Sequence, residues 1–100
     1  MKYNFKTHKR NTTFNGVQFT LSVNESPRDL TGCVITMYID NKTFSTDNGA
    51  ILITDAINGK FQFKKQIVTL SPKILNYYII FLFLNGDKKM YLEGTWQILP

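Results

Sequence analysis

Few side chains in this sequence of 100 residues are suited to catalysis. The single histidine, His8, is the only imidazole that could serve as a general acid or base near neutral pH, and it lies among basic residues. An exposed, mobile side chain is favoured there over a catalytic base. The single cysteine, Cys33, lies in an alternating apolar segment, which favours a small buried side chain over a reactive thiol. One cysteine also excludes an intrachain disulfide and a cysteine-based metal cluster.

The carboxylates are dispersed along the chain. They lie mostly in expected turns or at strand ends, where they usually cap the backbone: Glu25, Asp29, Asp40, Asp47, Asp55, Asp87 and Glu93. Asp47, Asn48 and Asp55 suggest a calcium site, but their spacing is not that of an EF-hand and a turn explains them equally well. Phosphate-binding loops, paired-histidine metal motifs and nucleophile elbows are absent. We therefore expect no enzyme, no cofactor and no metal, although a pair of carboxylates assembled in one cleft would revive an enzymatic function.

Part of the net charge of +5 lies near the N-terminus. Five basic or titratable side chains precede the first acid, Glu25: Lys2, Lys6, His8, Lys9 and Arg10. We predict a basic arm over residues 1–13 that orders on contact with an acidic or apolar face of a partner protein. Its contact candidates are Tyr3, Phe5, Lys6, Lys9 and Arg10. The pairs Lys64, Lys65 and Lys88, Lys89 are interpreted instead as solvated strand ends.

The aromatic residues argue against nucleic acid as a partner, despite the basic charge. Single-strand binders expose aromatic rings between Lys and Arg side chains, whereas most rings here fall in apolar alternation and are expected in the core: Phe19, Phe61, Phe63, Phe81, Phe83 and Trp96. Tyr3, Phe5 and Phe14 are the exceptions, because they are mixed with basic residues.

Alternation of apolar and polar residues with a period of two predicts an all-β protein. Residues 14–23 are the clearest strand, with Val17, Phe19, Leu21 and Val23 on one face and a bulge or bend at Gly16. Further strands are expected over residues 33–39, 50–54, 61–64, 67–70, 75–84, 88–92 and 95–99, with a kink at Gly94. Residues 75–84 are apolar on both faces, which predicts a central strand covered on both sides.

Turn residues separate these segments. Asp47-Asn48-Gly49, Asn58-Gly59 and Asn85-Gly86-Asp87 are strong turn sequences, and Asn41 with Lys42 suggests a tight turn. Seven to eight strands with a turn about every ten residues predict a sandwich or a small barrel. The longest apolar run, residues 77–84, is shorter than the roughly 20 residues of a membrane helix, and the first ten residues do not form a secretory signal.

The order of these turns and strands resembles a known family. Asp29-Leu30-Thr31-Gly32 leads directly into a strand, residues 53–61 contain an Asp-led Asn-Gly turn, a Tyr-led apolar strand begins at Tyr77, and the chain closes with residues 92–98. Over residues 14–99 this resembles the immunoglobulin-like N-terminal domain of tailed-phage baseplate upper proteins and related phage tail and virion modules. Asp29 can bind the amides of its turn, Leu30 can plug the end of a sandwich and Gly32 permits the turn into the next strand. Tyr77 or Tyr78 can tie a connection to a neighbouring backbone.

This resemblance implies an antiparallel immunoglobulin-like β-sandwich over residues 14–100. It also implies a virion building block, made in the host cytoplasm, that contacts other virion proteins and forms a homo-oligomer. In the baseplate proteins a long host-binding extension follows the domain, whereas this chain ends at Pro100. A compact tail, baseplate or capsid accessory protein is therefore expected. The alternative is a carbohydrate- or cell-surface-binding module, for which Tyr38, Tyr91 and Trp96 are the candidate aromatic residues.

Overall fold

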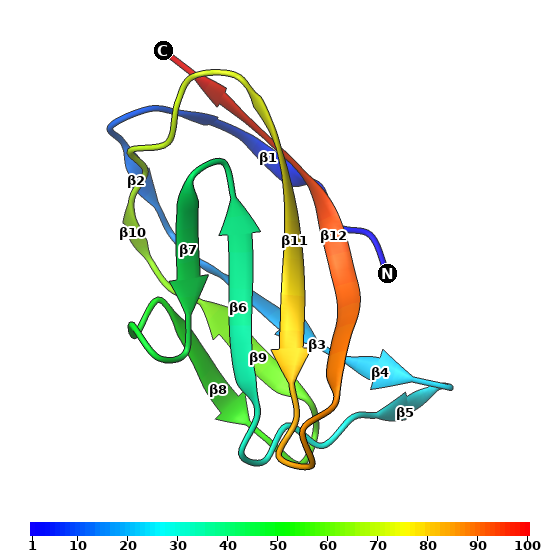
Figure 1. Cartoon of the computed structure of the whole chain (residues 1–100). Helices are drawn as coiled ribbons and strands as arrows, with labels where there is room; N and C mark the ends of the chain where they lie inside the picture. Colours follow the sequence, from blue (N-terminus) through cyan, green and yellow to red (C-terminus); the bar gives the residue numbers. More distant parts are fainter.

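The computed structural model describes residues 1–100 and contains strands and turns without any helix (Figure 1). The all-β prediction is confirmed. Eight strands have four or more residues: β1 (Phe5–Lys9), β3 (Val17–Thr20), β6 (Val34–Ile39), β7 (Lys42–Ser45), β8 (Ile51–Asp55), β9 (Lys60–Phe63), β11 (Ile74–Leu82) and β12 (Lys88–Leu99). Four have two residues: β2 (Thr13–Phe14), β4 (Ser22–Val23), β5 (Ser26–Pro27) and β10 (Gln66–Ile67). The structure contains no helix that is long and apolar enough to cross a membrane.

Two larger sheets contain most of the strands. One has the order β1-β12-β11-β6-β7 and the other the order β3-β9-β8, while β10 pairs with β2 and β4 with β5 (Figure 1). All pairs are antiparallel except β1 with β12, which run parallel. The prediction of a purely antiparallel fold is therefore wrong at this edge, where the first long strand joins the last.

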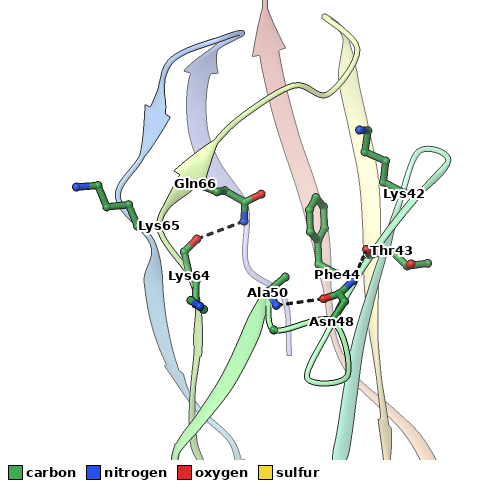
Figure 2. A pocket seen from close by; sticks show the side chains of 9 residues that line it. Lys42, Thr43, Phe44, Asn48, Ala50, Lys64, Lys65 and Gln66 are labelled. Carbon is green, nitrogen blue, oxygen red and sulfur yellow. Dashed lines mark hydrogen bonds between the residues drawn. The ribbon is translucent and has the colours of Figure 1, made fainter.

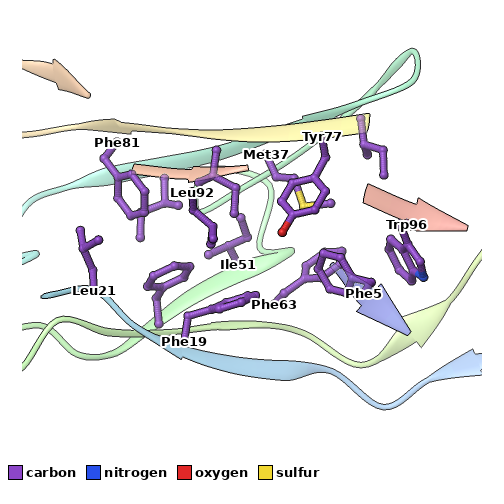
Figure 3. Packing of buried hydrophobic residues seen from close by; sticks show 14 of the residues in the cluster. Phe5, Phe19, Leu21, Met37, Ile51, Phe63, Tyr77, Phe81, Leu92 and Trp96 are labelled. Atoms are coloured by element: carbon purple, nitrogen blue, oxygen red, sulfur yellow. The ribbon is translucent and has the colours of Figure 1, made fainter. Parts of the chain in front are cut away.

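The two larger sheets share one hydrophobic core (Figure 3). Alternate residues of each strand point inward, so aromatic rings from opposite sheets meet. The rings of Phe61 and Phe81 are 5.5 Å apart and those of Phe63 and Trp96 are 6.1 Å apart. All six aromatic residues expected in the core are buried, as is Cys33.

The N-terminal segment is part of this folded body. Phe5 is only 7% exposed and stacks on Trp96 at 4.5 Å, while the amide of Tyr3 donates to the carbonyl of Glu93 at 2.9 Å. The radius of gyration is 13.5 Å, close to the roughly 13 Å of a compact chain of this length. The expectation of a separate arm over residues 1–13 is wrong, because Tyr3 and Phe5 themselves form an alternating apolar pattern that the intervening basic residues obscured.

Gly94 permits the N-terminal segment to cross β12. The strand continues through this glycine, so the expected kink and break are wrong. A Cβ atom at position 94 would overlap the carbonyl group of Tyr3. Next to this crossing, Oδ1 of Asn4 accepts hydrogen bonds from the backbone amide and the hydroxyl of Thr95, at 3.1 and 3.2 Å. The absent side chain therefore makes room for a close approach between two strands.

Several predicted strand boundaries differ from the structure. The strand expected over residues 67–70 is only the two-residue β10, and the strand expected over residues 75–84 ends at Leu82. Residues 14–23 form parts of β2, β3 and β4 rather than one strand, and the positive φ of Gly16, 88°, marks the first break. β7 was not predicted, since the turn was expected at Asn41 and Lys42. The chain instead reverses through Asp40, whose φ is 53°, and Lys42 begins the returning strand.

The predicted turn before β6 has the expected contacts. Oδ1 of Asp29 accepts from the amide of Thr31 at 2.9 Å and from its hydroxyl at 2.6 Å, and Leu30 is fully buried. Gly32 follows with a φ of 70°. A capped acid, a buried leucine and a left-handed glycine therefore produce this turn together.

The Asn58-Gly59 turn is also present, with one difference. Nδ2 of Asn58 donates to Asp55 at 2.8 Å, and only Gly59 has a positive φ, 70°. The carbonyl of Gly59 accepts from the amide of Leu21, and a Cβ atom at this position would approach the Arg28 carbonyl to 2.9 Å. Glycine is needed here both for its backbone conformation and for a close contact.

Candidate functional site

The outward side of β11 is apolar and uncovered. Its inward residues Leu75, Tyr77, Ile79 and Phe81 are buried, whereas Ile74 is 65% exposed on the opposite side. No strand or loop lies over this side of the five-stranded sheet (Figure 1). The prediction that both sides of this strand are covered is therefore wrong for the single chain. The residues that the sequence pattern marks for burial remain at the surface.

Neighbouring strands extend this apolar surface. The register places Tyr78 beside Tyr38, Ile80 beside Met90 on one side and Thr36 on the other, and Leu82 beside Val34. We define the outer patch as Val34, Tyr38, Tyr78, Ile80, Leu82 and Met90. Tyr78 and Met90 are 44% and 51% exposed. The rings of Tyr38 and Tyr78 stack at 5.1 Å with an angle of 22°, so the patch has a flat aromatic end.

Polar residues surround the outer patch. Lys88 lies opposite Leu82, Glu93 opposite Tyr78 and Thr43 opposite Tyr38. Beside Tyr78 is a hollow of about 290 Å³, and Asn76, Glu93, Thr95 and Lys2 are among the polar residues that line it. An apolar centre with a polar rim is the usual composition of a protein–protein interface.

A second candidate surface lies at the β7 edge of the five-stranded sheet, between β7 and the segment that follows β9 (Figure 2). The groove has a volume of about 550 Å³. We define the lysine groove by its lining: Lys42, Thr43, Phe44, Asn48, Gly49, Ala50, Lys64, Lys65 and Gln66. Figure 2 shows Lys42 on one wall and Lys64 with Lys65 on the other. The only ion pair of the structure joins Lys73 to Asp40 at 3.6 Å, so all three groove lysines lack a carboxylate partner.

Asn48 shapes the lysine groove by closing the free edge of β7. Its Nδ2 donates to the carbonyl of Thr43 at 3.2 Å, and its Oδ1 accepts from the amides of Ser45 and Ala50 at 3.0 and 3.1 Å. The side-chain amide thus bonds the edge of β7 much as a paired strand would. Because Oδ1 already accepts two amides, Asn48 acts in a turn, which is the interpretation that the sequence offered beside a calcium site.

The contact residues predicted near the N-terminus lie in two environments. Tyr3, Phe5 and Lys6 line one hollow of about 470 Å³, but Phe5 belongs to the core and Tyr3 packs against it. The prediction that Phe5 is a surface contact residue is therefore wrong. Lys9 and Arg10 are exposed at the end of β1 and lie outside that hollow.

The side chain of His8, in the same segment, contacts a neighbouring residue. Its side chain is half-buried, and Nε2 lies 2.9 Å from the hydroxyl oxygen of Thr12, within hydrogen-bonding distance. The expectation of an exposed, mobile imidazole is therefore wrong.

Of the three aromatic residues suggested for sugar binding, only Tyr38 is exposed. Trp96 is buried, and Tyr91 is half-buried against Phe81 and Phe83. Tyr78, which the structure places beside Tyr38, was considered only for a structural role. The signal for it was available in the sequence, since Tyr78 occupies the second face of the doubly apolar strand.

Two buried groups have altered acidity. Burial raises the pKa of the Cys33 thiol to about 11, and the nearby Arg28 opposes this only in part. The thiol is therefore protonated and unreactive at neutral pH. Burial, with a smaller effect of Tyr3, also raises the pKa of Tyr77, whose phenol donates a hydrogen bond to the carbonyl of Tyr3.

Comparisons with protein-family models, with curated proteins and with solved structures give no match for this chain. The outer patch and the lysine groove are accordingly interpreted from their own residues.

Proposed function

We propose that the chain is a non-catalytic structural subunit of a phage virion, in the tail, the baseplate or as a capsid accessory, and that it acts through protein–protein contacts. The observation that supports contact with other proteins is the uncovered apolar side of β11. The virion setting comes from the resemblance of residues 14–99 to phage tail modules. We further propose that the outer patch joins two copies of the chain.

The strand order supports an immunoglobulin-like sandwich as the finer description of the fold. The sheet β3-β9-β8 has the order of strands B, E and D, and β6, β11 and β12 correspond to C, F and G, with β7 as an added C′ strand. Two departures from antibody domains are that no disulfide joins the sheets and that the buried tryptophan, Trp96, lies on the last strand.

Two copies related by a two-fold axis would have complementary outer patches. We place the axis between the two facing sheets, perpendicular to the strands and level with Ile80. With the observed register, Leu82 of one copy then lies against Tyr78 of the other, and Lys88 lies against Glu93. Small side chains then face large ones, and opposite charges meet at the rim. Twelve patch side chains would be covered. They are already partly buried in the single chain, so each contributes less than the about 1.5–3 kcal/mol of full burial. Their sum must offset the roughly 4–15 kcal/mol lost on association, which the measured dimer affinity reports.

The test is the mass of the chain in solution. Sedimentation equilibrium should give a dimer for the native chain and a monomer for Tyr78→Lys, with unchanged far-ultraviolet circular dichroism. Gln62→Lys on the outer side of the three-stranded sheet is the matched control and should remain dimeric. A native chain that stays monomeric at high concentration, or a Tyr78→Lys dimer of native affinity, would contradict self-association. Recovery of the chain in purified virions at a fixed stoichiometry tests the virion setting separately.

A carbohydrate-binding module is the second candidate, and one observation favours it. The stacked rings of Tyr38 and Tyr78 lie beside the hollow that contains Asn76 and Glu93, which combines an aromatic platform with hydrogen-bonding side chains. Glycan arrays discriminate the two functions. Tight binding of a sugar by the monomer, abolished in Tyr78→Ala, would favour the module, and dimerisation without sugar binding favours assembly.

A further inference from the structure

We propose that the lysine groove binds an acidic, extended segment of a partner protein through the carboxylates of that segment. The groove lies outside the outer patch, so this inference does not depend on self-association. It also differs from the interpretation of Lys64 and Lys65 as solvated strand ends, because folding brings a third lysine, Lys42, to the opposite wall.

The charges of the four hollows on this protein distinguish the lysine groove. The hollow beside Tyr78 contains both Lys2 and Glu93, and the hollow at Arg28 contains Asp29. The N-terminal hollow has one lysine, Lys6. Only the lysine groove is lined by three lysines and no carboxylate. The side chain of Lys65 points away from the opposite wall (Figure 2), so its ammonium group adds positive charge from beside the groove. Like charges gathered in a concave surface attract ligands of the opposite sign.

The hydrogen-bonding groups of the groove favour an anionic ligand over a neutral sugar. The side-chain amide of Asn48 is already bonded on both sides, and Nε2 of Gln66 donates to the carbonyl of Lys64 at 3.3 Å. Lysine ammonium groups donate and cannot accept. Sugar hydroxyls need acceptors as well as donors, whereas carboxylates only accept. Oε1 of Gln66 and the hydroxyl of Thr43 remain as acceptors, so the preference for carboxylates rests on the positive charge of the lysines.

The rings and strand edges favour a peptide that is recognised by its side chains. Phe44, the one aromatic residue of the groove, is half-buried, and its ring lies edge-on to Phe63 at 5.2 Å, so no exposed ring is available for stacking of bases. Phe44 and Ala50 offer apolar contact to the aliphatic part of an acidic segment. Asn48 blocks pairing of a further strand with β7. Lysine–carboxylate contacts therefore supply the recognition.

Fluorescence polarisation with a labelled peptide of alternating Glu and Ala tests this site. The native chain should bind it, with an affinity that falls as salt is added, and should not bind the matched peptide of Gln and Ala. Lys64→Gln/Lys65→Gln should weaken binding about tenfold, since each exposed ion pair contributes modestly. The control Lys6→Gln/Lys9→Gln removes the same charge elsewhere and should change the affinity less than about twofold. Gln66→Glu, which places a carboxylate in the groove without shortening any lysine, should also weaken binding.

Several outcomes would overturn the proposal. Equal losses in the two double variants would show attraction by net charge alone. Equal binding of the Gln peptide would exclude recognition of carboxylates. Tighter binding of a single-stranded oligonucleotide or of heparin than of the acidic peptide would assign the groove to a different polymer. Repeating the titration with Tyr78→Lys separates the two surfaces, because loss of the dimer with retained peptide binding leaves the groove intact.

Discussion

The outer sides of the two larger sheets differ although their inner sides are alike. Both sheets place phenylalanine and isoleucine in one shared core. Outside, β9 and its neighbours present the row Gln18, Gln62 and Leu52, whereas the other sheet presents the outer patch. Burial explains the inner residues of both sheets. Only the outer residues can therefore indicate contacts with other molecules.

Two strands show this difference most directly. β9 alternates Lys60, Phe61, Gln62 and Phe63, which is the pattern of a strand with one wet side. β11 is apolar at nearly every position, although half of these positions face outward. β9 combines a buried inner side with polar outer residues, so burial on one side does not require an apolar outer side. The apolar outer side of β11 is thus unnecessary for folding, and a contact surface is our explanation for it.

The largest expected effect is a difference in the free energy of unfolding between substitutions on the inner and outer sides of β11. Phe81→Ala should lower the free energy of unfolding by about 3–5 kcal/mol, because it leaves a cavity beside Phe61 in the core. Ile80→Ala, one residue away on the outer side, should cost less than about 1 kcal/mol in the monomer. Urea denaturation in a Tyr78→Lys background, where the chain is expected to be monomeric, measures both. Similar costs for the two substitutions would mean that the outer side is also packed.

A second adjacent pair tests the same contrast through hydrogen bonding. Tyr77→Phe removes the bond to the carbonyl of Tyr3 and should cost about 1–2 kcal/mol. Tyr78→Phe should cost less than about 0.5 kcal/mol. Amide hydrogen exchange over residues 3–9 should accelerate only in Tyr77→Phe, because this phenol holds the N-terminal segment.

The raised pKa of Tyr77 adds a dependence on pH to this pair. The folded chain retains the phenolic proton more tightly than the unfolded chain, so native stability should fall as the pH rises above about 10. Tyr77→Phe should lack this contribution. An identical alkaline decline in both proteins would contradict the assignment to Tyr77.

A smaller effect is expected from making the polar outer side resemble the apolar one. Gln18→Ile/Gln62→Ile adds two apolar side chains in the same row as Leu52. We expect native folding and weak association beyond the dimer, since a second apolar outer side allows each dimer to contact further copies. Sedimentation velocity over a range of concentrations detects these species. Strictly dimeric behaviour would show that apolar composition alone does not create an interface on this scaffold.

Much of the fold followed from local pattern. Period-two alternation predicted the inward residues of β3, β6 and β9, and turn chemistry predicted the turns at Asp29 and at Gly59. These succeeded because each depends on residues adjacent in sequence. The parallel pairing of β1 with β12 joins residues about 90 positions apart, and no local pattern reports such a contact.

The candidate surfaces were predicted less well for the same reason. The lysine groove needs Lys42 beside Lys64 and Lys65, which only the packing of β7 near β10 provides. Phe5 was assigned to a contact arm because its neighbours are basic, although its side chain completes the core. The outer patch was visible as a doubly apolar strand, and the error was to assume that the chain itself covers both sides.

The smallest expected effect concerns Asp29, which caps the connection between the two sheets and lies on neither outer side. The hydrogen bonds from the hydroxyl and amide of Thr31 lower the pKa of its carboxyl. The charged form therefore stabilises the folded chain at pH values above the ordinary pKa of about 3.9, and this contribution is lost as the pH falls through the lower folded value. Asp29→Asn should melt slightly below the native chain at pH 7, and the difference should vanish near pH 2. Thr31→Val should move the pKa back toward its ordinary value, which NMR titration of the carboxyl measures directly. Neither change should alter the dimer affinity, because both act on the connection between the sheets and leave the outer patch untouched.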